Sequence, residues 1–161
     1  MIEFAPYEVE VGGGTLALSP MPGRTRHYYT DWLRLLEWRP DHVISMTPMS
    51  ELERKGAATL GTDLQAEGIS WSHVPVADFG TPDAVAMTLW PDAERKALAT
   101  LGSGGKVLVH CYGGCGRSGM AVLKIMIAAG ENSEAALARL RQARPCAVET
   151  EAQMQWAMSR G

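Results

Sequence analysis

A ten-residue segment in the second half of the chain, HCYGGCGRSG (residues 110–119), combines a nucleophile, a cation and several glycines. Cys111 opens the segment and Arg117 follows six positions later. Small residues between them let successive backbone amides point inward, and such a nest binds a tetrahedral anion. An arginine guanidinium can hold two oxygens of that anion at once. The predicted phosphate-binding residues are Tyr112, Gly113, Gly114, Cys115, Gly116 and Arg117.

The surroundings that bind phosphate would also prepare Cys111 as a nucleophile. A cysteine attacks as the thiolate, and inward amides, a helix N-terminus and Arg117 all favour a negative charge on sulfur. Ser118 is predicted to stabilise the thiolate when it leaves phosphorus, and His110 to hold the loop rather than carry a proton. The alternative is a buried cysteine at a strand end before a glycine-rich turn. The strand before and the helix after favour a catalytic loop, with a phosphocysteine at Cys111.

This chemistry needs a second group, because the leaving oxygen must gain a proton and a water must later lose one. The segment VPVADFGTPD (residues 74–83) offers a carboxyl group on a loop with Gly and Pro around it. We predict Asp78 as the general acid and base, with Phe79 anchoring the loop by packing. A solvated turn is the alternative for Asp78. Asp83 is predicted to cap the next helix instead.

The elements that must position these residues alternate between strands and helices. Apolar runs predict strands, and apolar residues at helical spacing predict helices. The pattern predicts an α/β domain with a largely parallel central sheet, and residues 1–161 as a single phosphatase domain. The predicted strands are 7–11, 15–18, 42–46, 70–76 and 106–110; the predicted helices are 28–38, 51–67 with a break near Gly56 or Gly61, 84–101 with a kink at Pro91, 116–129, 133–144 with Ser133 as a cap, and 150–160.

Composition excludes several classes of function. The chain has 15 basic and 18 acidic residues and a net charge of −3, so nucleic acid is not an expected partner. No apolar segment is long enough for a membrane helix, and no secretory signal is visible at the N-terminus. We therefore expect a cytoplasmic protein without a membrane partner. Arg24 is predicted to be a solvated arginine, with a place on the substrate-facing rim as the alternative.

The three cysteines are an odd number, which argues against a disulfide framework and fits a reducing compartment. Cys115 lies four positions from Cys111. One hypothesis is a reversible disulfide between them that protects Cys111 from over-oxidation. The favoured alternative is a small residue that fits the loop. Cys146 is expected to be structural.

The segment at residues 110–119 resembles the signature of the protein-tyrosine phosphatase superfamily, and ADFGTPD (residues 77–83) resembles its acid loop. The small size is similar to the dual-specificity branch. Residues 16–24, 73–83, 110–114 and 147–156 resemble the kinase-associated phosphatase, or cyclin-dependent kinase inhibitor 3, family. The resemblance implies a mostly parallel sheet of four to five strands flanked by helices, and no metal or other cofactor. Glu149 stands where that family tends to carry glutamine.

The sequence thus predicts a phosphatase for phosphorylated proteins, through Cys111, Asp78, Arg117 and Ser118. The resemblance implies activity on phosphotyrosine, phosphoserine or phosphothreonine. One alternative is a phosphate-recognition module without turnover, which would need neither a thiolate nor an acid. A second is a rhodanese-like sulfurtransferase working through a Cys111 persulfide.

Overall fold

A five-stranded sheet forms the centre of the molecule. The computed structural model describes residues 4–159 of the chain. The strands lie in the order β1-β2-β5-β3-β4, in which β1 is antiparallel to β2 and every other neighbouring pair is parallel. The predicted α/β fold with a mostly parallel sheet is confirmed. The strands are β1 (Tyr7–Val11), β2 (Gly14–Ser19), β3 (His42–Ser45), β4 (Ser70–His73) and β5 (Lys106–His110).

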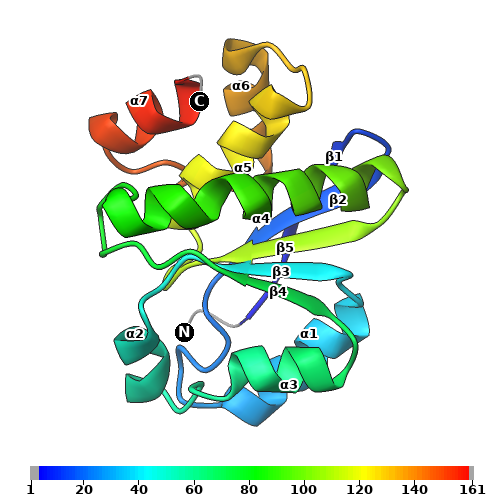
Figure 1. Cartoon of the computed structure of the whole chain (residues 1–161), viewed down its shortest axis with the longest axis vertical. Helices are drawn as coiled ribbons and strands as arrows, with labels where there is room; N and C mark the ends of the chain where they lie inside the picture. The colour runs from blue at the N-terminus through cyan, green and yellow to red at the C-terminus, as the bar shows by residue number, and fades with distance from the viewer. Residues whose placement is uncertain (1–3, 160–161) are drawn as a thin grey trace.

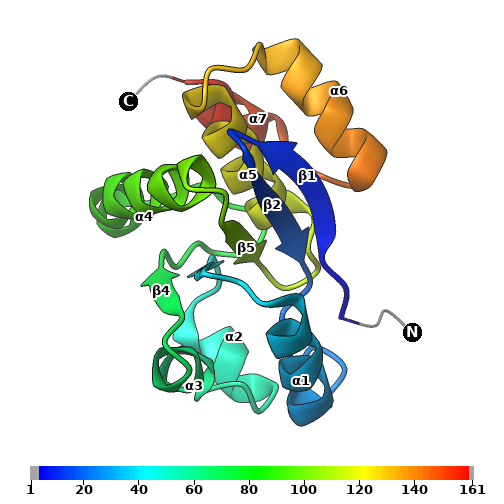
Figure 2. The ribbon, with the colours of Figure 1, turned by 90° about the vertical axis from the view of Figure 1, so that its right-hand side faces the viewer.

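Helices cover both faces of this sheet (Figures 1 and 2). Among residues 4–159, three helices lie on one face and four on the other, so the central strands are buried on both sides. Successive side chains of a strand point to opposite faces. Leu108 accordingly joins the core under the first group of helices, whereas Val107 and Val109 join the core under the second. The first group is α1 (Tyr28–Trp38), α2 (Met49–Arg54) and α3 (Leu60–Ala66); the second is α4 (Ala84–Gly102), α5 (Gly116–Ala128), α6 (Ser133–Ala143) and α7 (Glu151–Met158).

Most predicted elements occur within a few residues of their expected bounds. The helical segment predicted over 51–67 has its predicted break at Gly56, which has a positive φ of 75° and lies between α2 and α3, whereas Gly61 lies inside α3. Asp83 caps α4 as predicted, because its Oδ1 accepts a hydrogen bond from the backbone of Ala86 at 2.9 Å. Pro91 lies inside α4, which continues past it. The predicted end of the last helix at Arg160 lies outside the described residues.

Ser133 was predicted to cap α6, and this is wrong. The cap is Asn132, whose Oδ1 accepts a hydrogen bond from the backbone of Ala135 at 3.0 Å. Both side chains are good helix caps. Asn132 takes the position because its backbone is still extended, with φ of −64° and ψ of 134°, whereas Ser133 is already helical.

The carboxyl ends of the parallel strands meet at one edge of the sheet. His110 at the end of β5 pairs in register with Ser19 of β2 and Ser45 of β3, and Ser45 pairs with His73 of β4. Ligands of open α/β sheets bind at this edge. Among residues 4–159, no helix has the length and apolar character to cross a membrane.

Candidate active site

Cys111 lies directly after β5, and the chain from there curves into the N-terminus of α5. Its side chain is buried, and its Sγ lies 3.1 Å from the Oγ of Ser118 in the first turn of the helix. A helix N-terminus carries a partial positive charge and unpaired amides. The geometry therefore places the sulfur where a thiolate gains a hydrogen bond and a favourable field.

The loop after Cys111 has the tight curvature that glycine permits. Gly114 has a φ of 75°, a left-handed conformation that costs other residues energy. A Cβ at this position would also lie 2.6 Å from the backbone of Ser19 and Pro20 at the end of β2. The glycine is thus required both by its own backbone conformation and by the close approach of β2.

Arg117 is buried and anchored by a residue that sequence reasoning missed. Its guanidinium donates to both carboxylate oxygens of Glu51 in α2, at 2.6 and 3.1 Å. Burial alone would lower the pKa of Arg117, but the hydrogen bonds to Glu51 and the negative charges of Cys111, Glu51 and Asp78 raise it overall. Arg117 is therefore a fixed cation at the mouth of the loop. Glu51 lies 66 residues away in sequence, and no local motif marks it.

Asp78 lies within reach of the same arginine. Its Oδ1 lies 3.3 Å from the Nη2 of Arg117, and the Nη1 of Arg117 donates to the carbonyl of Val76 at 2.8 Å. More than half of the Asp78 side chain is exposed. The structure thus brings the predicted acid and the predicted phosphate-binding arginine together across the pocket.

Phe79 does not anchor the acid loop by packing, so that prediction is wrong. Its backbone has a positive φ of 60° and its side chain is 62% exposed. Its amide donates to the carboxylate of Asp78 at 3.0 Å. The left-handed turn directs the ring outward, and the loop is held instead by Gln153, whose Nε2 donates to the carbonyl of Gly80 at 3.2 Å.

His110 is fully buried beneath the loop. Its Nε2 lies 2.6 Å from the Oγ of Ser45, and its Nδ1 lies 3.2 Å from the carbonyl of Cys111. Burial, with further contributions from His73 and Arg117, lowers the pKa of His110 to about 4. The imidazole is neutral near pH 7, and its contacts are those of a residue that holds the loop.

A pocket of about 210 Å³ joins the predicted site residues. Cys111, Arg117 and Asp78 line it together, as do Tyr112, Gly113 and Cys115. A larger hollow of about 510 Å³ lies elsewhere, by Trp90 and Lys124, but that lysine already donates to the carbonyls of Trp156 and Ser159. Four residues of the smaller pocket were not predicted as site residues, namely Arg24, Phe79, Arg144 and Glu149.

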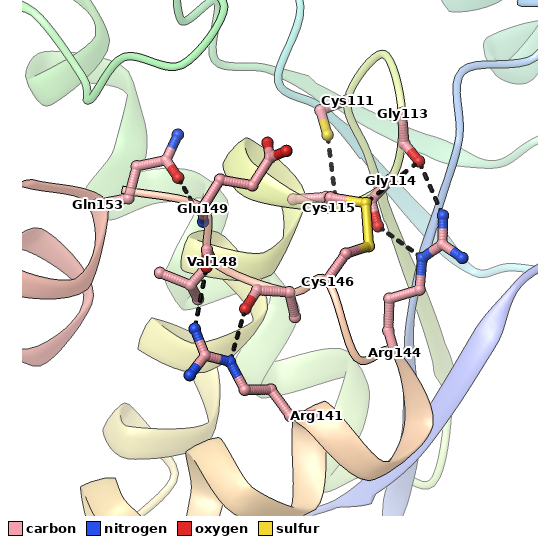
Figure 3. Close-up of a disulfide and its surroundings, with 12 residues drawn as sticks. Cys111, Gly113, Gly114, Cys115, Arg141, Arg144, Cys146, Val148, Glu149 and Gln153 are labelled. Atoms are coloured by element: carbon pink, nitrogen blue, oxygen red, sulfur yellow. Dashed lines mark hydrogen bonds between the residues drawn. A yellow bond between two sulfur atoms is a disulfide. The ribbon is translucent and has the colours of Figure 1, made fainter. Parts of the chain in front are cut away.

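A disulfide joins Cys115 to Cys146, and Cys111 is the free cysteine (Figure 3). The argument from three cysteines against a disulfide framework is therefore wrong, and so is the hypothesis of a Cys111–Cys115 bond, because Cys115 pairs with Cys146. The partners are 31 residues apart in sequence, but the fold brings their Cα atoms to 5.2 Å, within the range of a disulfide. An odd count gives no information about which cysteines meet in space.

The segment after α6 holds the anion-binding loop from outside (Figure 3). Arg144 donates to the carbonyls of Gly113 and Gly114 at 2.9 and 3.1 Å. The amide of Val148 donates to the carbonyl of Cys115 at 3.1 Å. These bonds use the outward carbonyls of the loop, and the disulfide adds a covalent link at the same place. Hydrogen bonds and a disulfide from the segment after α6 thus hold the loop in its conformation.

Within residues 4–159, no group of three or more His, Cys, Asp or Glu side chains is arranged to hold a metal ion.

A sequence model described as "Tc-R-P: Polymorphic toxin system, DSP-PTPase phosphatase" matches residues 24–131, about two thirds of the chain. The chain belongs to this DSP-PTPase phosphatase family. The matched residues include Cys111, Arg117, Asp78 and Glu51. The predicted membership in the dual-specificity branch of the protein-tyrosine phosphatase superfamily is thereby confirmed.

Relatives of this DSP-PTPase phosphatase extend the comparison. The mouse (Mus musculus) protein "Cyclin-dependent kinase inhibitor 3" is 31% identical over 116 residues, which are 69% of this chain and 54% of the mouse protein. The chain thus spans about half the length of the curated relative it matches.

Solved structures show the same fold. A kinase associated phosphatase with serine at its catalytic-site cysteine has a TM-score of 0.83 at 23% identity, covering 98% of this chain and 94% of that chain. Tk-PTP in its active form has a TM-score of 0.70 at 28% identity, covering 93% of this chain and 92% of that chain. The five-stranded sheet flanked by helices is the fold of these phosphatases.

Proposed function

We propose that this chain hydrolyses phosphate monoesters on proteins through a phosphocysteine at Cys111. The observation that carries the proposal is the single pocket that Cys111, Arg117 and Asp78 line together. A binding module would need neither a buried thiol beside a hydroxyl nor a carboxylate opposite it. Family membership supports the same activity, because the family is described as a DSP-PTPase phosphatase.

In the first step, the Cys111 thiolate attacks phosphorus, so that an S–P bond forms as the bond to the leaving oxygen breaks. The amides of residues 112–117 and the guanidinium of Arg117 hold the three other phosphate oxygens. Asp78 gives its proton to the leaving oxygen. The bound phosphate would displace Asp78 from Arg117 and leave its carboxyl group beside the leaving oxygen.

In the second step, water attacks phosphorus and the S–P bond breaks. Asp78, now a carboxylate, accepts the proton of that water. The electron pair returns to sulfur, where the hydroxyl of Ser118, 3.1 Å away, can donate to the thiolate. Glu51 takes part indirectly, because it fixes the guanidinium of Arg117.

The proposed substrates are phosphorylated proteins carrying phosphotyrosine, phosphoserine or phosphothreonine. The dual-specificity description of the family supports this range. The family description also names polymorphic toxin systems. We therefore propose that the substrates are phosphorylated proteins with which such a toxin system comes into contact. Nucleic acid and membrane lipids are not proposed as partners, because the chain has a net charge of −3.

We also propose that residues 1–161 make up one phosphatase domain that acts in the cytoplasm. The two apolar cores on opposite faces of one sheet support a single domain.

The cysteines bear on the proposed cytoplasmic location. A free Cys111 fits a reducing compartment, whereas the Cys115–Cys146 disulfide fits an oxidising one. Rapid alkylation of thiols in intact cells tests the location. A fully oxidised Cys115–Cys146 pair in growing cells would contradict a cytoplasmic site.

Turnover of p-nitrophenyl phosphate without added metal tests the chemistry. We expect no turnover in Cys111→Ser and a loss of about 100-fold or more in Asp78→Asn. Asp83→Asn is the matched control, because that carboxylate caps α4. Full activity in Cys111→Ser would refute the proposal. Tight phosphopeptide binding without turnover would favour a recognition module, and transfer of sulfur from thiosulfate to cyanide would favour a sulfurtransferase.

A further inference from the structure

Basic side chains gather beside the catalytic pocket, around the ring of Tyr112. The guanidinium carbon of Arg24 lies 5.0 Å from the ring centroid, and the Nζ of Lys55 lies 5.8 Å from it. The same ring lines the catalytic pocket and an adjoining hollow of about 360 Å³. Arg26 and Arg54 line this hollow as well. We call Arg24, Arg26, Arg54 and Lys55 the Tyr112 basic cluster.

The two carboxylates nearby offset only part of the positive charge of this cluster and Arg117. Glu51 and Asp78 also line the hollow, but both pair with Arg117, at 2.6 and 3.3 Å. Across the part of the chain that the structure describes, no side chain of the Tyr112 basic cluster takes part in an ion pair. A local excess of positive charge therefore lies next to the pocket, in a chain whose net charge is negative.

Arg24 carries a more specific sign of a missing acceptor. Its Nη1 is buried and has no hydrogen-bond partner among residues 4–159. A buried donor without an acceptor costs free energy, so such groups usually have a partner. The backbone around it is fixed, because Arg24 donates to the carbonyl of Met21 and Met21 donates to that of Tyr112, both at 3.0 Å. Arg24 also lines the catalytic pocket.

We infer that the Tyr112 basic cluster binds a second anionic group of the substrate, next to the phosphate that Cys111 attacks. This inference rests on the proposed function and narrows its substrate class. The ligand is a protein segment in which a phosphorylated residue has a second phosphorylated or acidic side chain close to it. The net charge of −3 disfavours adsorption to an anionic membrane, which favours a protein segment over a phosphoinositide.

Two synthetic peptides test this inference. Both contain one phosphotyrosine, flanked by glutamates in one peptide and by glutamines in the other, so that size is matched and charge differs. We expect the wild type to turn over the glutamate peptide with a kcat/KM about tenfold higher at low salt, with the preference falling as salt screens the charges. In the double variant Arg54→Gln/Lys55→Gln the preference should shrink to about twofold. Arg95→Gln, which removes an exposed charge from α4, should retain the wild-type preference.

Equal rates for the two peptides in the wild type would overturn the inference, as would an unchanged preference in the double variant. Faster turnover of a soluble inositol bisphosphate than of either peptide would overturn the assignment to proteins. Calorimetric binding of both peptides to Cys111→Ser separates the two proposals. If the wild type hydrolyses neither peptide but Cys111→Ser still binds the glutamate peptide more tightly, the proposed function fails and the anion-binding cluster stands.

Discussion

The anion-binding arginine is held at the residue scale by a partner outside the catalytic loop. Glu51 binds both terminal nitrogens of Arg117, and each side chain is buried. A guanidinium held at two points presents its remaining donors in one direction. The position of the phosphate in our mechanism therefore depends on α2 as much as on the loop itself.

Glu51→Gln tests this dependence. The variant keeps the shape of the side chain but leaves Arg117 without its main buried counter-charge, so we expect a loss of stability of about 3 kcal/mol. Turnover of p-nitrophenyl phosphate should fall about 100-fold, because a small displacement of the arginine misplaces the substrate. Urea unfolding and steady-state kinetics measure the two effects. Glu53→Gln, an exposed residue of the same helix, should leave both unchanged; wild-type turnover in Glu51→Gln would show that Arg117 is positioned by other contacts.

The curvature of the loop makes a second prediction at this scale. Gly114→Ala puts a Cβ into the backbone of β2 and into a left-handed conformation, so binding of inorganic phosphate and turnover should both be lost. Gly68→Ala is the control, because Gly68 has the same φ of 75° but no atom within 4 Å of the added Cβ. It should cost only about 1–2 kcal/mol of stability, with turnover retained. Equal effects of the two substitutions would mean that the backbone conformation alone, and not the contact with β2, decides the outcome.

At the scale of elements, the disulfide links the start of α5 to the segment between α6 and α7. It closes a loop of about 30 residues that contains both α5 and α6. Hydrogen bonds from Arg144 and Val148 join the same two segments. The covalent bond therefore adds to contacts that are already present, and its main effect is expected on the unfolded chain.

Reduction of this bond should lower the free energy of unfolding by about 3–4 kcal/mol, from the length of the closed loop. Urea unfolding with and without dithiothreitol measures the loss. Cys146→Ser should have the reduced stability under both conditions and show no response to the reductant. Titration of thiols in the denatured protein should find one free cysteine before reduction, Cys111. Three free thiols in protein purified without reductant would contradict the pairing.

Site residues could be predicted from the sequence where they lie close together along the chain, and not where they lie far apart. Cys111, Arg117 and Ser118 share one short loop, so their spacing alone indicated an anion site. Glu51 and Cys146 reach that loop through tertiary packing, from 66 and 31 residues away, and no local pattern marks either one.

Phe79 shows a different limit of sequence reasoning. Its apolar side chain suggested packing, but the positive φ of its backbone directs the ring outward. The central strands were predictable, because their apolar runs match burial on both faces of the sheet. The break predicted near Gly56 or Gly61 in the helix over 51–67 was also predictable, because Gly56 permits the left-handed turn between α2 and α3.

At the scale of the whole molecule, two buried histidines couple stability to pH. Burial lowers the pKa of His42 to about 4, with a further contribution from Lys96, and the pKa of His110 to about 4 as well. An unfolded histidine titrates near 6.5. As the pH falls below about 6.5, the unfolded chain binds protons that the folded chain does not, so stability is lost down to about pH 4.

His42→Gln should reduce this loss, because it removes one of the two buried histidines. His42 lies at the start of β3, at the end of the strand away from the catalytic loop, so the substitution should leave that loop intact. Between pH 6.5 and 4.5 the slope of unfolding free energy against pH should decrease by up to about 1.4 kcal/mol per unit. Urea unfolding at several pH values measures the slope. His27→Gln, an exposed histidine, should keep the wild-type slope. Identical slopes in all three proteins would mean that His42 is protonated equally in both states.

The contact between Asp78 and Arg117 has a consequence for the release of the product, inorganic phosphate. Cells contain inorganic phosphate, which any tight anion site would retain after each cycle. In the mechanism we propose, the carboxylate of Asp78 can return to Arg117 as phosphate departs, because the two groups lie 3.3 Å apart in the structure. The carboxylate of Asp78 thus competes with inorganic phosphate for Arg117. Weak inhibition by inorganic phosphate follows, and a phosphatase that releases its product readily can keep working where that product is abundant.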